Sequence, residues 1–236
     1  MSSAVMINKL KRTPKRTTID GLLKIVDNFE FPEYKTQTCK NVRKDLCQYL
    51  KYIYLNDDAH IKSSVFVGGG FWRSFIKGEW PKDIDVFYRN SNTANIHIFD
   101  MIRTGCVVPF TETDMDPPLH VLTYRFIKQP VFCSKIVPSI VKMQSVFIRD
   151  YISPPDVLES FPYTINGMVY DGNCIVYDPM IFYDMLLEKT LMPLTKPLRK
   201  VNPRYYAKLL SYGFTPGAGL TKEDLVDDNL PAWGYV

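Results

Sequence analysis

The sequence of 236 residues predicts an α/β protein of the α+β kind, with a small mixed sheet, flanking helices on one face and a short helical C-terminal segment. Three observations predict this class. Apolar residues recur at helical spacing through most of the first quarter of the chain. Farther along the chain, short runs of β-branched and aromatic residues bounded by glycine alternate with segments whose apolar residues have helical spacing. The longest apolar runs are about half the length of a membrane span, so no membrane partner is expected.

The composition narrows the class further. The chain is 46% hydrophobic and 23% charged, which is ordinary globular usage. Its net charge of +4 suits an anionic ligand but is too weak to require nucleic acid. The five cysteines are odd in number and form no C-x-x-C pair, so neither a disulfide framework nor a structural zinc site is expected. This cysteine usage predicts a reducing, cytoplasmic location.

The N-terminal part is predicted to be helical after a basic start. Residues 1–17 are rich in Lys and Arg and are expected to form a flexible tail. Residues 18–29 place apolar side chains on one helical face, and Thr17 or Thr18 is suited to cap that helix. Residues 39–55 repeat the pattern and form the clearest amphipathic helix of the chain.

Residues 63–89 change character and predict a strand, a glycine turn, a short helix and a second strand. Residues 65–67 are a β-branched and aromatic run that ends at three glycines, which is typical of a buried strand followed by a tight turn. FWRSFIKG, residues 71–78, has helical spacing and stops at glycine. KDIDVFYR, residues 82–89, alternates as a strand does.

The remaining elements follow from the same signals. Helices are predicted over residues 90–105, 156–161, 180–191 and 203–212, strands over residues 120–127, 140–148 and 173–179, and a proline-rich loop over residues 106–118. YTINGMVYD, residues 163–171, fits a helix and a strand equally well. The chain from residue 221 onward is expected to be acidic and irregular.

The stretch with a chemical pattern lies within the predicted strand over residues 82–89. Asp83 and Asp85 stand at alternate positions, so both carboxylates point to the same side of the strand, while Ile84 points into the core. Two carboxylates held this close repel each other, and a divalent cation relieves the repulsion. Hard oxygen ligands suit Mg²⁺ or Mn²⁺, with phosphates and water completing the coordination. Asp83 and Asp85 are therefore the predicted metal ligands and catalytic carboxylates.

The glycine turn supplies the complementary half of the site. Gly69 and Gly70 lack Cβ atoms, so their backbone N–H groups can approach a phosphate closely, and the helix that follows adds its dipole. Arg73 lies three residues into that helix and can reach the same phosphate. The Walker A pattern and the dinucleotide fingerprint are both absent from the sequence. Gly69, Gly70 and Arg73 are the predicted triphosphate-binding residues.

At these residues the chain resembles the DNA polymerase β-like nucleotidyltransferase superfamily, and within it the head domain of the tRNA nucleotidyltransferase and poly(A) polymerase group. That group carries G-G-x-x-R-D followed by D-x-D. The pattern matches Gly69, Gly70, Arg73, Asp83 and Asp85, whereas Ser74 stands at the position of the first acid. The resemblance implies that the two aspartates bind Mg²⁺ or Mn²⁺ and that the glycines hold a nucleoside triphosphate.

Two later segments extend the resemblance over roughly residues 60–215. Residues 161–179 look like the R-R-D-F-T-I-N-A motif followed by I-x-D-P, with Asn166 at the asparagine position and Pro162 in place of the acid. Asn166 is therefore implied as a nucleotide-binding residue. Residues 203–214 resemble the helix that follows the head, and the strand before the motif is similar to those of small phage and viral nucleotidyltransferases.

Polymerase β-like sites usually carry a third carboxylate on a neighbouring strand. Asp150, just after the predicted strand over residues 140–148, is the candidate for that catalytic role. Gln144, in the middle of the same strand, is the alternative occupant of the position.

The resemblance divides the chain into four parts: a basic tail (1–17), an N-terminal helical segment (18–58), a nucleotidyltransferase head (59–190), and a helical neck-like segment with an acidic tail (191–236). The expected activity is metal-dependent transfer of a nucleoside monophosphate from a nucleoside triphosphate to a hydroxyl of an RNA 3′ end, a protein or a small molecule. Few residues follow Phe214, so CCA addition to tRNA is not the expected task. The alternative, suggested by Ser74 and Pro162, is a catalytically lapsed fold that binds nucleotide or protein.

Overall fold

The computed structural model describes residues 13–55, 58–110, 121–129, 131–134, 138, 140–194 and 199–230. The chain divides into two compact units. The first, named the sheet unit, comprises residues 16–157 and 169–176. The second, named the small unit, comprises residues 1–15, 158–168 and 177–236. Among the helices of the described residues, none has the length and apolar character needed to cross a membrane.

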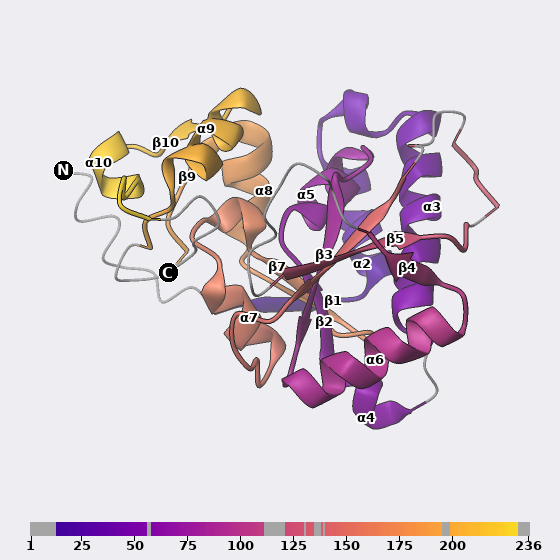
Figure 1. The fold of residues 1–236 in the computed structure, drawn as a ribbon. Coiled ribbons are helices and arrows are strands. Elements are labelled where there is room, and N and C mark those ends of the chain that lie inside the picture. The colour runs from indigo at the N-terminus through magenta and orange to yellow at the C-terminus, as the bar shows by residue number, and fades with distance from the viewer. Residues whose placement is uncertain are drawn as a thin grey trace. The chain divides into compact units, whose positions relative to one another are not determined.

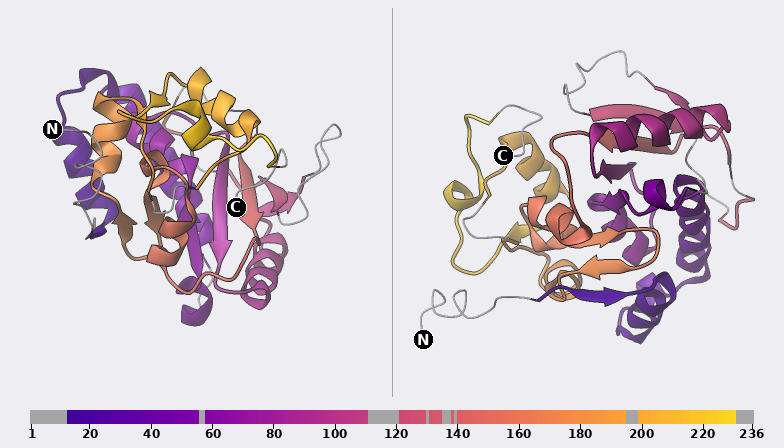
Figure 2. Two further views of the ribbon diagram at one scale, coloured as in Figure 1. Left: turned by 90° about the vertical axis from the view of Figure 1, so that its left-hand side faces the viewer. Right: turned by 90° about the horizontal axis from the view of Figure 1, so that it is seen from below.

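The sheet unit is built on an eight-stranded sheet with the order β1-β8-β7-β2-β3-β6-β5-β4 (Figures 1 and 2). The strands are β1 (Lys15–Thr17), β2 (Val65–Gly68), β3 (Asp83–Tyr88), β4 (Val107–Pro109), β5 (Val121–Phe126), β6 (Lys142–Val146), β7 (Met168–Tyr170) and β8 (Ile175–Tyr177). Strand β3 is antiparallel to β2 and parallel to β6. The predicted mixed sheet is therefore confirmed, and the D-x-D strand lies inside it rather than at an edge.

The helices before β7 are α2 (Ile19–Asn28), the 3-10 helix η1 (Pro32–Tyr34), α3 (Gln37–Ile53), α4 (Ala59–Lys62), α5 (Gly70–Lys77), α6 (Ser91–Arg103) and α7 (Pro154–Ser160). All but η1 and α4 fall in segments that the sequence predicts to be helical. The Thr18 hydroxyl oxygen caps α2 by accepting from the Gly21 N–H at 3.0 Å. Thr36 caps α3 in the same way, so this helix begins two residues earlier than the apolar pattern alone predicts.

Helices α3 and α6 cover one face of the sheet. Ile84, which lies between the two aspartates of β3, is fully buried on that face. The Tyr49 ring of α3 packs against Phe126 of β5 with ring centroids 4.8 Å apart. The His97 ring of α6 places its Nδ1 atom 3.2 Å from the Tyr88 hydroxyl of β3. Side chains alternate along a strand, so the opposite face is the one that carries the D-x-D carboxylates.

At β1 and β4 the structure corrects the sequence predictions, and it resolves the segment that fitted a helix and a strand equally well. Residues 15–17, predicted as part of a flexible tail, form strand β1, while residues 1–12 lie outside the described part of the chain. The predicted loop over residues 106–118 contains β4, because Val107 and its neighbours pair with β5 in antiparallel register. The ambiguous segment 163–171 is both structures in turn, a 3-10 helix followed by β7.

The small unit is made of short elements. They are η2 (Thr164–Asn166), α8 (Met180–Phe182), the π-helix η3 (Tyr183–Leu187), β9 (Thr190–Leu191), α9 (Pro203–Ser211), β10 (Thr215–Pro216) and α10 (Lys222–Leu225). The helix predicted over residues 180–191 ends at Leu187, because Lys189 adopts φ 50° and Thr190 enters β9. The prediction of an irregular segment after residue 221 was wrong at α10, where Thr221 donates to the Asp224 carboxylate in a capping box.

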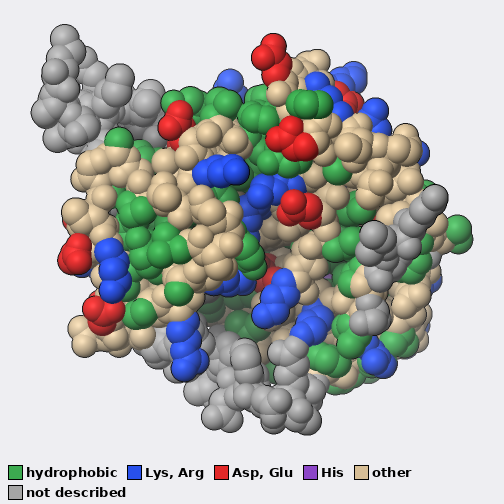
Figure 3. Space-filling model, turned by 90° about the horizontal axis from the view of Figure 1, so that it is seen from above, with side chains coloured by type: hydrophobic (Ala, Val, Ile, Leu, Met, Phe, Trp, Pro, Cys, Tyr) green, Lys and Arg blue, Asp and Glu red, His purple; other side chains and the backbone are tan. Residues whose placement is uncertain are grey.

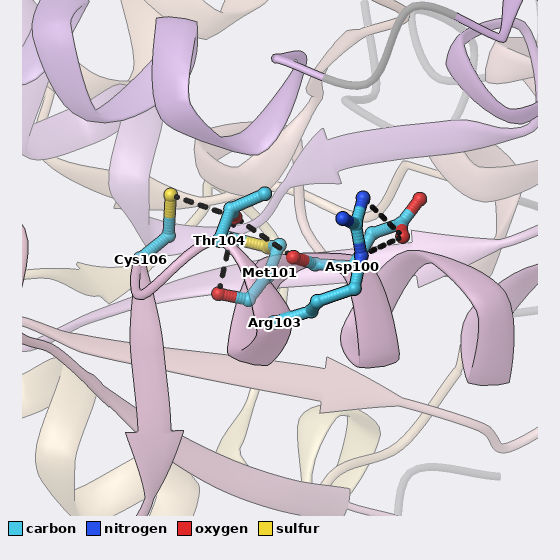
Figure 4. A network of polar contacts seen from close by, with 5 residues as sticks. All are labelled: Asp100, Met101, Arg103, Thr104 and Cys106. Atoms are coloured by element: carbon cyan, nitrogen blue, oxygen red, sulfur yellow. Dashed lines mark hydrogen bonds and ion pairs between the residues drawn. The ribbon is translucent and has the colours of Figure 1, made fainter.

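A network of polar contacts stabilises the C-terminal end of α6 (Figure 4). The Thr104 hydroxyl donates to the carbonyl oxygen of Asp100 at 2.7 Å and lies 3.4 Å from the Cys106 sulfur. The Arg103 guanidinium pairs with the Asp100 carboxylate at 3.3 Å. Gly105 then turns the chain with φ +67° into β4, which agrees with the predicted end of this helix.

Arg43 joins three backbone segments and gives a stability prediction. Its side chain is buried and donates to the carbonyl oxygens of Phe75 at 3.0 Å, Ile76 at 2.6 Å and Tyr34 at 2.6 Å. Arg43→Met keeps the aliphatic bulk but leaves these acceptors without their charged donor, so we expect the free energy of unfolding to fall by about 2–4 kcal/mol. Urea denaturation measures this change.

The matched control is Arg103→Met, since Arg103 is an exposed arginine whose ion pair with Asp100 lies on the surface. Its replacement is expected to change the free energy of unfolding by less than about 1 kcal/mol. Equal effects of the two substitutions would contradict a structural role for Arg43.

Candidate active site

The two aspartates lie at the start of β3, beside the end of β2. Asp83 and Asp85 are both half-buried, whereas Ile84 between them is fully buried. In the antiparallel register Asp85 lies opposite Gly68, the last residue of β2. The alternation predicted from the sequence is therefore present: both carboxylates leave the same face of the sheet, at the end of the strand where the glycine turn begins.

The glycine turn contacts the second of these carboxylates. Gly69 adopts φ 71° and ψ −149°, a region that is almost exclusive to glycine. A Cβ atom at this position would overlap Asp85 Oδ2 and would lie 3.3 Å from Asp85 Cγ. The absence of a side chain at Gly69 is what lets the carboxylate lie against the turn.

Arg73 folds back over the same turn from the first turn of α5. A Cβ atom at Gly70 would lie 3.3 Å from Arg73 Nη2, so the guanidinium group sits next to this glycine. The structure thus brings together four predicted site residues, Gly69, Gly70, Arg73 and Asp85, with Asp83 two residues along the strand. A guanidinium beside backbone N–H groups at a helix start is an arrangement suited to phosphate oxygens.

The neighbouring strand β6 places two further polar side chains beside the aspartates. Because β3 and β6 are parallel and in register, Lys142 lies opposite Asp83 and Gln144 lies opposite Asp85. Both are half-buried, and Met143 between them is fully buried on the helix-covered face. Gln144 is therefore the residue of β6 that lies opposite Asp85 in the register.

The register continues onto β5 and defines two rows of side chains. The rows are Asp83, Lys142 and Arg125, and Asp85, Gln144 and Thr123. The Lys142 ammonium lies 5.1 Å from the centroid of the Phe110 ring, and Phe110 follows β4, on the side of β5 away from β3. Figure 3 shows one face of the molecule, on which Lys and Arg are the more frequent charged side chains. The sequence did not predict Lys142 and Arg125 as site residues, because only the register of the strands shows that they lie in the same row as Asp83.

Asp150 is not brought to the aspartate pair. It is exposed and follows β6 by four residues, and the next residue, Tyr151, donates its N–H to the carbonyl oxygen of Tyr88 at 3.2 Å. Tyr88 is the last residue of β3, at the end opposite to Asp83. The parallel direction of β3 and β6 therefore carries Asp150 away from the D-x-D end.

Asn166 belongs to the small unit and is described there. It ends the 3-10 helix η2 and is 4% exposed, and its Nδ2 donates to the Tyr205 hydroxyl at 2.7 Å. Thr164 in the same turn donates to the buried Asp184 carboxylate at 2.5 Å. The T-I-N segment is thus held by polar side chains of its own unit.

The donor set of the sheet unit fits a divalent cation that is shared with a ligand. Asp83 and Asp85 supply hard anionic oxygens from one face of one strand. Within the described ranges, no group of three or more His, Cys, Asp or Glu side chains is placed to hold a metal. The two carboxylates alone suit a divalent cation that takes its remaining ligands from phosphate oxygens and water.

A cavity of about 450 Å³ lies elsewhere in the sheet unit, where the end of α3 meets α6. None of the predicted site residues lines it. His97 on its wall is buried, and burial lowers the pKa of its imidazole, so the ring is neutral near pH 7. Its Nε2 atom lies 2.7 Å from the Ile53 carbonyl oxygen. These contacts give His97 a packing role between α3, α6 and β3.

Comparison with known proteins adds a family and a set of structures. The model of the Gabija anti-defense 2 family matches residues 40–187, a range that contains both aspartates, the glycine turn and β6. No curated protein matches the chain.

Several solved structures are similar to part of the chain. They include a CCA-adding enzyme in its apo form I (15% identity, TM-score 0.46, 76% of this chain and 37% of that one), the Thermotoga maritima CCA-adding enzyme complexed with tRNA (16%, 0.41, 76% and 36%), and a tRNA nucleotidyltransferase with a primer tRNA and an incoming ATP analogue (16%, 0.39, 64% and 41%). The chain thus spans roughly two fifths of the length of these enzymes or less.

Proposed function

The chain belongs to the Gabija anti-defense 2 family, and we propose that it acts against the Gabija defence as a metal-dependent nucleotidyltransferase. The reaction would move a nucleoside monophosphate from a nucleoside triphosphate to an acceptor hydroxyl and release pyrophosphate. One observation carries the proposal. The Asp83 and Asp85 carboxylates leave one face of β3 directly beside the Gly69 turn, which has no side chain and so leaves room for Asp85.

Each residue has a defined task in this reaction. Asp83 and Asp85 would hold Mg²⁺ or Mn²⁺. Gly69 and Gly70 present backbone N–H groups to the triphosphate, and the Arg73 guanidinium pairs with its oxygens. When bound, the ion supplies positive charge to the triphosphate and to the oxygen that leaves.

The transfer itself is a single displacement at phosphorus. The acceptor oxygen forms a bond to the α-phosphorus, the bond between that phosphorus and the bridging oxygen of the β-phosphate breaks, and the electron pair leaves with pyrophosphate. The hydroxyl proton passes to water. Asn166 stays a proposed nucleotide contact, on the strength of the T-I-N motif. The acceptor is an RNA 3′ end, a protein or a small molecule.

A catalytically lapsed module is the second candidate, and two observations favour it. Ser74 replaces an acid of the resembled pattern, and Lys142 and Gln144 occupy the β6 positions beside the aspartates. Such a protein would counter the defence by binding a nucleotide or a protein partner without turnover.

Labelled nucleotide transfer tests the enzyme. The full chain is incubated with Mg²⁺ or Mn²⁺, each α-labelled nucleoside triphosphate in turn, and a lysate of cells that carry the Gabija defence. We expect pyrophosphate release and label on one class of acceptor, and no release in the presence of EDTA. Bound nucleotide without release, across all four nucleotides and both metals, would support the lapsed module instead.

A further inference from the structure

The glycine turn between β2 and α5 has no side chains of its own to fix its shape. Gly69 takes the N-cap position of α5 and offers no side-chain oxygen to the first N–H groups of that helix. Glycine also loses more conformational freedom on ordering than any other residue. The shape of the turn therefore depends on the residues on either side of it.

The Trp72 side chain bridges this turn. Its indole Nε1–H donates to the carbonyl oxygen of Val67 at 3.0 Å. Val67 belongs to β2, before the turn, and Trp72 belongs to the first turn of α5, after it. The hydrogen bond thus closes a ring around Gly68, Gly69 and Gly70, and it ties the end of the strand to the start of the helix.

Both ends of this hydrogen bond are anchored in the core of the sheet unit. Trp72 and Val67 are fully buried. The indole packs edge-on against three rings, at centroid distances of 4.9 Å for Phe71, 5.5 Å for Phe75 and 6.0 Å for Tyr170. Val67 pairs with β3 on one side and with β7 on the other. Because packed interior groups have little room to shift, the bond holds α5 at a fixed distance from β2.

The residues inside and beside this ring are those assigned to the triphosphate. A Cβ atom at Gly69 would overlap Asp85 Oδ2, so the turn and the carboxylate lie against each other. Arg73 directly follows Trp72 in α5, and its Nη2 would lie 3.3 Å from a Cβ atom at Gly70. A shift of α5 relative to β2 would therefore displace the backbone N–H groups of the turn and the guanidinium group together.

We propose that Trp72 is a positioning residue of the triphosphate site, and that its indole N–H holds the glycine turn in the shape that binds phosphate oxygens. Trp72 stands at an unspecified position of the G-G-x-x-R-D pattern, so the resemblance gives it no role. Its own side chain is buried, and it acts through Gly69, Gly70 and Arg73. The inference rests on the proposed function, which takes these three residues as the ones that bind the triphosphate.

Removal of the indole N–H alone tests the inference. β-(3-Benzothienyl)alanine, incorporated in place of Trp72 in the full chain, keeps the fused ring but has sulfur where the indole has N–H. Calorimetric titration with Mg²⁺ and each of four nucleoside triphosphate analogues, whose α–β bridge cannot be cleaved, measures the dissociation constants. We expect the Kd of the analogue that the wild type binds most tightly to rise about tenfold. A buried hydrogen bond shifts an equilibrium by about that factor, and the affinity falls with the fraction of molecules in the binding shape.

Tyr54→Phe is the matched control. The Tyr54 hydroxyl lies 3.0 Å from the carbonyl oxygen of Val65 and 2.9 Å from that of Tyr170. Its removal also deletes a hydrogen bond to the backbone of the sheet, but it leaves the ring around the glycine turn intact. Urea denaturation should show a lower free energy of unfolding for both variants, whereas the Kd of Tyr54→Phe should stay within about twofold of the wild-type value.

The outcomes separate the inference from the proposed function. An unchanged Kd after the replacement of Trp72, or an equal rise in Tyr54→Phe, would overturn the inference and leave the transferase proposal standing. A wild type that binds none of the four analogues would overturn the proposed function itself, and the role of Trp72 with it.

Discussion

Replacing Asp83 or Asp85 by asparagine is expected to reduce pyrophosphate release by about a thousandfold or more, because metal coordination is worth several kcal/mol in such reactions and each 1.36 kcal/mol is a factor of ten in rate. Asparagine keeps the size of the side chain but removes the negative charge that holds the cation. Both aspartates are half-buried, so the free energy of unfolding should change little. Initial rates with saturating Mg²⁺ and circular dichroism melts measure the two effects.

The control for this result is Asp100→Asn. Asp100 is an acid of the same unit that pairs with Arg103 at the C-terminal end of α6 and does not belong to the candidate site. This variant should retain full activity. Asp150→Asn tests the third carboxylate that the sequence suggests. If it lowered the rate of pyrophosphate release as much as Asp83→Asn does, Asp150 would be a catalytic residue despite its distance from the aspartates in the strand register.

The same variants separate enzyme from binding module in cells that carry the Gabija defence. The wild-type chain should suppress the defence, and Asp83→Asn should fail to suppress it while accumulating to the same level. Full suppression of the defence by this variant would contradict an enzymatic mechanism and favour the catalytically lapsed module.

Gly69→Ala is expected to lower pyrophosphate release by about a hundredfold, since misplacing a catalytic group by 1 Å has an effect of that size. The new Cβ atom would overlap Asp85 Oδ2, so the carboxylate must leave its position beside the turn. The substitution should also lower the free energy of unfolding by about 1–3 kcal/mol, because φ 71° with ψ −149° is a region that non-glycine residues avoid.

Gly105→Ala provides a matched control. Gly105 has a similar φ of +67°, but a Cβ atom there would meet nothing within 4 Å. It should show backbone strain of about 1–2 kcal/mol and no loss of activity. Equal activity losses in the two variants would mean that strain alone, and not the contact with Asp85, explains the effect at Gly69.

The local parts of this site could be predicted from the sequence, because short-range geometry determines them. The alternation at Asp83, Ile84 and Asp85 needs only the pleat of a strand, and the turn at Gly69 needs only its position between a strand and a helix. The helix caps at Thr18 and the stop at Gly78 follow from the same local rules.

The parts that involve β6 could not be predicted in this way. Strand β6 begins more than fifty residues after β3 ends, and its parallel direction depends on the packing of the elements between them. With that direction unknown, Asp150 and Gln144 were both open as neighbours of the acids. In the observed register Gln144 lies beside Asp85, and Lys142 lies beside Asp83. Lys142 is a cation, whereas the expected third residue is an anion.

The placement of β1 has a consequence for how the chain acquires its shape during synthesis. Strand β1 ends at Thr17 and pairs with β8, which begins at Ile175, so this edge joins segments almost 160 residues apart. The hairpin of β2 and β3 that carries the glycine turn and the aspartates closes over a far shorter loop. Short loops cost less entropy and close faster than long ones. On the ribosome, the β2–β3 pair can therefore assemble long before the outer edge of the sheet, which must wait until β8 has emerged.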